Sequence, residues 1–186
     1  MNSPKIPALG YALLGLLQKP SSGYDLRKVF SSTSMKTYSD SPGAIYPALG
    51  RLQKQGLIRG TIEDAAGLRR RQIFRLTPKG LAELKKWIAL PITREDLESG
   101  LKTVMLRFAF SETVSGTAAS LEILQALAAA FPPFLQHLRE QLQNMKGAPT
   151  SGRLALECGV RSYESLFEWT QYAIAIYEKQ TKGEVS

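Results

Sequence analysis

The stretch that decides the fold is residues 41–58, which read Ser-Pro-Gly-Ala-Ile-Tyr-Pro-Ala-Leu-Gly-Arg-Leu-Gln-Lys-Gln-Gly-Leu-Ile. Ser41 can cap a helix, and Pro42 suits the first helical position because the missing N–H costs nothing there. Gly56 ends the helix where a left-handed residue is favoured. Four apolar residues recur at helical spacing and define one buried face: Ile45, Ala48, Leu49 and Leu52. The stretch therefore predicts a short amphipathic helix.

The opposite face of this helix is small, aromatic and basic, and carries Tyr46, Gly50, Arg51 and Lys54. A DNA major groove accepts a helix of this kind. An ordinary surface helix with solvated cations has the same composition, so the helix alone leaves both interpretations open. Pro47 removes one helical hydrogen bond, and we expect a kink or a late helix start there.

The residues before this helix predict two more helices. Residues 8–18 carry Leu and Ala at helical spacing, and Pro20 ends that helix because proline disfavours helix in the residue before it. Ser22 and Asp25 have the spacing of a capping box, which opens a second helix that reaches about Ser34.

After the central helix the apolar period changes from helical to alternating. The runs 57–62 and 72–76 read as two strands of a hairpin, joined by a segment that ends in Arg69, Arg70 and Arg71. Thr77 and Pro78 then begin a fourth helix, whose buried face comprises Leu81, Leu84, Trp87 and Ile88. Three helices, a hairpin and a helix predict a winged helix-turn-helix domain over residues 1–90, with a two-stranded wing.

Pro91 marks the predicted start of a second domain, residues 91–186, which is helical throughout. Helices are expected at 96–110, 113–145 and about 153–179. The second of these carries a coiled-coil-like repeat, and Pro132 with Pro133 should divide it into two segments. The fold class is therefore mainly α, with the small β-wing in the first domain.

The apolar seams of the second domain have no fourth helix to cover them. They can pack against one another in a monomer or against a second copy of the chain. We expect a homodimer, because two-fold dimers are the commonest soluble oligomers and match palindromic DNA. The expected dimer interface comprises Leu121, Leu124, Leu135, Leu138, Leu142, Leu166, Trp169 and Ile176.

Charge divides the chain unequally. Residues 1–90 carry 15 Lys and Arg against 5 Asp and Glu, whereas residues 91–186 carry 9 against 11. A basic first half suggests that this half meets a polyanion, either nucleic acid or an acidic membrane surface. No apolar run in the sequence approaches the roughly 20 residues that span a bilayer, and no signal-peptide pattern is present. With a single cysteine, these features lead us to expect a cytoplasmic protein without a membrane partner.

Catalytic and metal sites find little support. His137 is the sole histidine, so neither a Ser-His-Asp arrangement nor a multi-histidine metal site can form. Cys158 is expected to be a small buried residue, and a redox role has only Arg153 and Arg161 nearby to support it. We expect no enzyme activity, no metal and no cofactor.

Several fragments, in order and at fitting intervals, resemble the PadR family of bacterial transcriptional regulators. They are Ala-Leu-Leu-Gly-Leu-Leu (12–17), Ser-Gly-Tyr-Asp-Leu (22–26), Gly-Ala-Ile-Tyr-Pro-Ala-Leu (43–49), Arg-Leu (51–52), Gly-Leu-Ile (56–58) and Arg-Leu-Thr-Pro-Lys-Gly (75–80). Residues 94–179 resemble the helical dimerisation region of the longer, virulence-activator-like branch, through helix pattern and the string Leu-Lys-x-x-x-Leu-Arg-Phe at 101–108. Phe74 departs from the family, which usually has Tyr there.

The resemblance implies a dimeric repressor that binds double-stranded DNA at an operator and is often released by a small, frequently aromatic effector. Tyr46 is expected to hold a phosphate, and Arg51 or Lys54 to reach base edges or backbone. For Tyr24, DNA contact and core packing are both open. The expected DNA-binding residues are Ser22, Tyr24, Ser41, Gly43, Tyr46, Arg51, Lys54, Arg69, Arg70 and Arg71.

An effector pocket can be lined by aromatic residues, although aromatics at helical spacing are usually core residues. The candidates are Trp87, Phe108, Phe131, Phe134, Phe167 and Trp169. Two other functions stay open: a winged-helix module that binds an acidic protein partner, and a small-molecule-binding protein without specific DNA binding.

Overall fold

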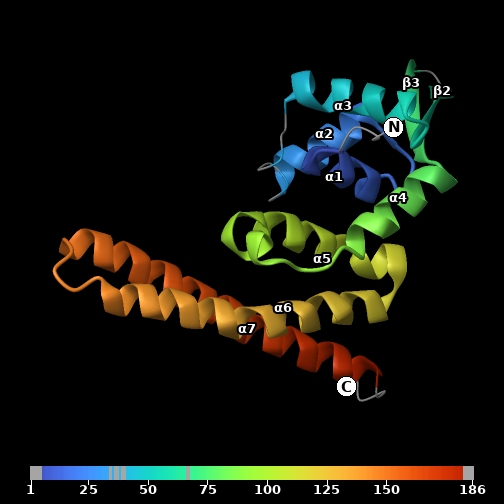
Figure 1. Ribbon diagram of the computed structural model, residues 1–186. Helices are drawn as coiled ribbons and strands as arrows, with labels where there is room; N and C mark the ends of the chain where they lie inside the picture. Colours follow the sequence, from blue (N-terminus) through green and yellow to red (C-terminus); the bar gives the residue numbers. More distant parts are fainter. Residues whose placement is uncertain (1–5, 34, 36–37, 39–40, 66–67, 182–186) are drawn as a thin grey trace. The chain divides into compact units, whose positions relative to one another are not determined.

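The computed structural model describes residues 6–33, 35, 38, 41–65 and 68–181. The chain forms two compact units, Met1–Ile88 and Ala89–Ser186, and Figure 1 shows the elements of each. The first unit contains, in order, α1 Ala8–Leu16, β1 Ser21–Ser22, α2 Gly23–Ser32, α3 Pro42–Lys54, β2 Ile58–Ala65, β3 Leu68–Leu76 and α4 Pro78–Ile88. Apart from β1, this is the predicted order of a winged helix-turn-helix.

The core of the first unit forms where α1 and α2 pack against the apolar face of α3, and α4 packs against α1. Ile45, Ala48, Leu49 and Leu52 are all buried, as their spacing predicted. The ring of Tyr11 stacks on the indole of Trp87 with centroids 4.3 Å apart and planes within 3°. Because this face of α3 is buried, the opposite face is turned toward solvent.

Of the two outcomes predicted for Pro47, a kink or a late helix start, the structure excludes the late start. The helix α3 begins at Pro42 and continues through Pro47, so a late start is wrong. The Oγ of Ser41 accepts a hydrogen bond from the N–H of Gly43 at 3.2 Å, which stabilises the early start. At the other end Gly56 has φ +70°, in the left-handed region expected for the residue that ends the helix.

The wing belongs to a three-stranded antiparallel sheet of order β1-β3-β2. Residue Phe74 of β3 pairs with Gly60 on one side and with Ser21 on the other. The strand β1 was not predicted, because two residues are too few to show an alternating pattern. The wing strands are also longer than predicted, so Arg69–Arg71 lie within β3 and not in the connection.

The helix α4 is anchored to the base of the wing through Thr77. The backbone N–H of Thr77 donates to the carbonyl of Leu57 at 3.0 Å. Its hydroxyl donates to the carbonyl of Gly56 at 2.8 Å and accepts from the N–H of Gly80 at 3.0 Å. These bonds satisfy polar groups at the start of α4 and fix its position against β2.

The second unit contains the π-helical turn η2 Asp96–Gly100 and the helices α5 Leu101–Ser115, α6 Thr117–Asn144 and α7 Thr150–Thr181. The helix α6 packs against α5 and α7, and Figure 1 shows α6 and α7 side by side, running in opposite directions. By length and composition α6 would also fit across a membrane, as core helices of soluble proteins do.

The predicted division of α6 at its two prolines is wrong. The helix is continuous through Pro132 and Pro133, and both prolines are exposed. The carbonyls that lose a partner belong to Ala128 and Ala129, neither of which is buried, so water can satisfy them. Buried residues on both sides of the prolines keep one apolar face in register.

Among the described residues, the buried polar side chains of the second unit are paired. Arg107 of α5 is buried, and its guanidinium donates to the carbonyl of Leu90. Burial lowers the pKa of Arg107, while the nearby charge of Asp96 acts in the opposite direction. The hydroxyls of Ser111 and Ser120 lie 2.6 Å apart and join α5 to α6. These hydrogen bonds satisfy the buried polar side chains, which therefore have a structural role.

Candidate nucleic-acid interface

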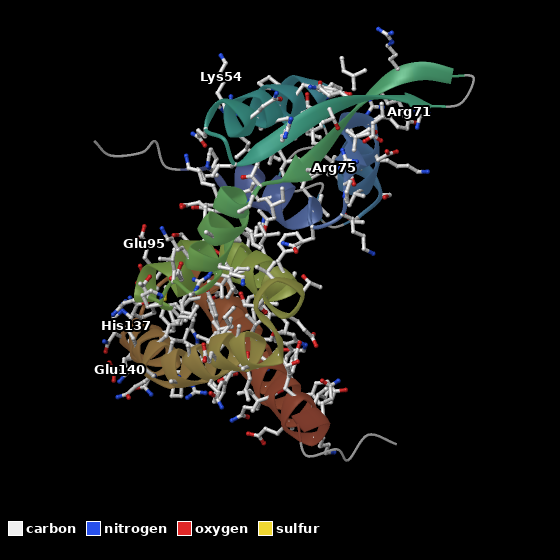
Figure 2. The ribbon with its side chains drawn as sticks, turned by 90° about the vertical axis from the view of Figure 1, so that its right-hand side faces the viewer. Lys54, Arg71, Arg75, Glu95, His137 and Glu140 are labelled. Atoms are coloured by element: carbon white, nitrogen blue, oxygen red, sulfur yellow. The ribbon has the colours of Figure 1, made fainter. Side chains whose placement is uncertain are left out.

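The outer face of α3 is open to solvent along its length. Ser41, Gly43, Tyr46, Arg51 and Lys54 are all exposed, and the ring of Tyr46 is 50% exposed. Figure 2 shows the Lys54 side chain extending away from the end of this helix. Within the described part of the chain, neither Arg51 nor Lys54 has a side-chain hydrogen bond or ion pair. Both cations are therefore available to an anionic partner.

At the start of α2, Ser22 and Tyr24 were both expected to bind DNA, but they differ in burial. Ser22 is buried, and its hydroxyl accepts from the Asp25 N–H at 3.1 Å and donates to the Asp25 carboxylate at 2.7 Å. It caps the helix, as expected, but offers little surface to DNA. Tyr24 is 60% exposed, and the guanidinium carbon of Arg27 lies 5.8 Å from its ring centroid. Core packing of Tyr24 is thus excluded.

The wing presents arginines on its outer surface. Arg70 and Arg71 are exposed; the side chain of Arg69 lies outside the described residues. Arg75 is held within the hairpin, because its guanidinium donates to Thr61 at 2.7 Å and to Glu63 at 2.6 Å. Figure 2 shows Arg71 further along the wing than Arg75.

The structure adds residues that the sequence analysis missed. The strand register sets Arg59 directly opposite Arg75, so that both lie on one face of the wing. Arg27 follows Tyr24 by three positions, a helical spacing that was readable in the sequence. Gly23 lies beneath the ring of Tyr46. No local pattern could show that contact, because it joins two different helices.

Most of the aromatic residues expected to line an effector pocket pack against other rings in the second unit. The rings of Phe108 and Trp169 meet edge to face with centroids 5.8 Å apart, and Phe131 meets Phe167 at 5.9 Å. Trp87 belongs to the core of the first unit. A groove of about 820 Å³ lies between α6 and α7, and of the six candidates Phe167 alone lines it. These rings thus serve first as packing residues.

The residues expected at a dimer interface divide by burial. Leu124 and Leu135 are buried within their own chain and therefore belong to its core. The partly or fully exposed members are Leu121, Leu138, Leu142, Leu166, Trp169 and Ile176. The helix α7 also exposes two residues that were not predicted, Leu154 (56%) and Tyr172 (65%). Cys158 is exposed on the same helix, contrary to the expected burial.

Comparison with known proteins relates the winged unit to one family. Residues 13–86 match the transcriptional regulator PadR-like family. Over 83 residues the chain is 36% identical to the negative transcriptional regulator PadR of Bacillus subtilis, covering 43% of this chain and 44% of that protein. Residues 13–86, most of the winged unit, are thus PadR-like. A probable transcriptional regulator of Mycobacterium tuberculosis is 26% identical over 188 residues, which cover 93% of this chain and all of that protein.

Solved structures of PadR-like proteins also align with most of the chain. Bacillus subtilis PadR in complex with operator DNA is 21% identical, covers 92% of this chain and 99% of its own, and has a TM-score of 0.43. The same protein in complex with p-coumaric acid is 21% identical, covers 96% and 99%, and has a TM-score of 0.38. The likeness to the PadR-like family rests on the sequence matches. The proteins that this chain matches are PadR-like transcriptional regulators.

Proposed function

We propose that this PadR-like regulator binds a specific operator as a homodimer, through the outer face of α3 and the wing. The observation that carries the proposal is the exposed surface of α3, where Arg51 and Lys54 have no partner among the described residues. An amphipathic helix with free cations on its outer side fits the major groove, where arginine reads guanine and lysine reaches base edges or phosphate.

The other residues of the interface have positioning roles in this proposal. The N-terminus of α3, with Ser41 and Gly43, faces a phosphate, because helix N-termini favour anions. The hydroxyl of Tyr46 donates to a phosphate of the same DNA strand. The wing arginines Arg70 and Arg71 lie along the backbone or in the minor groove. Ser22 acts as the cap of α2 and not as a DNA contact.

The homodimer is supported by apolar surface left open on the second unit. Leu154, Tyr172 and Ile176 are large apolar or aromatic side chains, all on α7 and all exposed. A second copy that packs against this helix about a two-fold axis would cover them. Two winged units would then read half-sites about one helical turn apart, roughly 34 Å.

Repression and its release are the finer part of the proposal. The relative from Bacillus subtilis is named a negative regulator, and that protein has been solved with p-coumaric acid. We propose that this chain also represses transcription in the cytoplasm and responds to a small aromatic effector. The rings of Phe108, Phe131, Phe134, Phe167 and Trp169 in the second unit are the candidates to rearrange around it.

Binding-site selection with the purified full-length protein tests the proposal. We expect one enriched pseudo-palindromic sequence, with half-site centres about one helical turn apart. Binding to the winning sequence should exceed binding to random DNA by at least about 1,000-fold at physiological salt. Arg51→Ala with Lys54→Ala should abolish the enrichment while leaving the thermal unfolding temperature unchanged.

The control for that variant is Arg94→Ala with Lys102→Ala, which removes the same charge from exposed positions of the second unit. It should enrich the same sequence as the wild type. A selection that recovers no common sequence would reject operator binding, and would favour a winged-helix module that binds an acidic protein partner.

A further inference from the structure

The ring of Tyr46 lies directly against Gly23, the first residue of α2. A Cβ atom placed on Gly23 would lie 2.6 Å from Cε1 of Tyr46, 3.2 Å from Cζ and 3.4 Å from Cδ1. All three nearest atoms belong to this one ring. The edge of the phenol that leads to the hydroxyl therefore rests on the backbone at the start of α2.

No other feature of Gly23 requires glycine. Its φ is not positive, since the positive-φ glycines of the described residues are Gly56, Gly116 and Gly147. An alanine would therefore fit the backbone of this position, and alanine is the better helix former. The contact with Tyr46 is what leaves no room for a side chain.

The backbone beneath the ring is held on both sides. Ser22 caps α2 through two hydrogen bonds to Asp25, and it pairs with Ile73 of the wing. On α2 itself, Leu26 and Phe30 are buried in the core. The ring of Tyr46 is half exposed and is the movable partner. A methyl group on Gly23 would therefore shift the ring and not the helix.

We propose that Gly23 is a positioning residue for operator recognition, which holds the phenol of Tyr46 in the orientation that meets a DNA phosphate. The inference rests on the proposed function, because it concerns the same surface. It links the start of α2 to the outer face of α3: the glycine leaves room for the ring to pack on the backbone, and this packing favours one orientation of the hydroxyl and reduces the rotamer entropy lost on binding.

A double-mutant cycle on the full chain tests the proposal, with the selected operator as the probe. Gly23→Ala should weaken operator binding about 3- to 10-fold when Tyr46 is present. In a Tyr46→Ala background the same substitution should change the affinity by less than about 2-fold, because no ring is left to displace. Gly152→Ala, also in the first turn of a helix, is the control; it meets only an ordinary contact at 3.7 Å and should leave binding unchanged.

Equal losses in both backgrounds would overturn the proposal, since Gly23 would then act without Tyr46. Unchanged affinity of Gly23→Ala would overturn it as well. Tyr46→Phe provides a second variant that keeps the ring and its contact. It should weaken binding at an unchanged unfolding temperature, and wild-type affinity would show that the hydroxyl is not the group that is positioned.

The position of the ring can also be measured without DNA, which separates this proposal from the proposed function. A nuclear Overhauser cross-peak is expected between the Gly23 Hα protons and the Tyr46 ring protons of the free protein. Its absence would overturn the positioning role even if the operator is bound. A cross-peak in a protein that selects no DNA sequence would reject the proposed function and, with it, the role in recognition.

Discussion

At the scale of single residues, burial separates the side chains that the sequence assigned to one surface. Ser22 and Tyr24 lie two positions apart, yet Ser22 is buried in a cap and Tyr24 is exposed beside Arg27. Arg51 is exposed with no side-chain partner among the described residues. Ser22 thus has a stability role, and a binding role is proposed for Arg51.

Ser22→Ala is expected to lower stability and leave recognition intact. The cap bond to the Asp25 N–H is lost, which costs about 1 kcal/mol of unfolding free energy. Urea unfolding of the full chain measures this difference. Operator affinity, measured well below the unfolding temperature, should stay within about 2-fold of the wild type. A large loss of operator affinity in a folded variant would show that Ser22 contributes to DNA binding.

At the scale of elements, the winged unit depends on how closely α4 approaches the start of the wing. A Cβ on Gly80 would overlap the carbonyl oxygen of Leu57, which is backbone and cannot turn aside. A Cβ on Gly50, in the exposed middle of α3, would meet nothing within 4 Å. Gly80 therefore has no room for a side chain, whereas Gly50 does.

The pair predicts opposite changes in stability. Gly80→Ala should destabilise the protein by about 1–3 kcal/mol or more, because the overlap forces α4 away from β2. Gly50→Ala should stabilise it by about 0.5–1 kcal/mol, because alanine costs less conformational entropy in a helix. Thermal unfolding of both variants measures the difference, and two changes of the same sign would contradict the packing described for α4.

The wing is the second element with a distinct prediction. Arg70→Ala with Arg71→Ala should weaken binding to all DNA sequences alike, because the wing contacts are proposed to be with the backbone. The slope of log affinity against log salt should fall by about one to two. Arg94→Ala with Lys102→Ala removes an equal charge from the second unit and should leave the slope unchanged. An unaltered slope in the wing variant would remove the wing from the interface.

At the scale of the whole molecule, the prediction concerns assembly. Leu154→Glu with Tyr172→Glu should convert the proposed dimer into a folded monomer, because two charges would face the partner's apolar surface. Sedimentation measures the mass, and operator affinity should fall about 100-fold or more as the two half-sites lose their link. Gln125→Glu adds a charge at an exposed position of α6 and is the control. A variant that remains dimeric would place the interface elsewhere.

Much of the fold was readable because its signals are local. The spacing of Ile45, Ala48, Leu49 and Leu52 predicted which side of α3 is buried, and Ser41 with Gly56 marked its ends. Errors arose where the local signal was absent or misleading. Two residues cannot reveal a strand such as β1, and two prolines do not break a helix whose buried faces continue on either side of them.

The sequence by itself determined the amphipathic helix, its caps, the basic first half and the PadR-like match of residues 13–86, since each depends on residue identity and spacing along the chain. Only the tertiary structure decided which candidates reach the surface. It buried Ser22, exposed Tyr24 and assigned Leu124 to the core. It also placed the ring of Tyr46 on Gly23. The physical reason is that burial and contact between elements depend on how distant segments pack, which no periodicity within one segment contains.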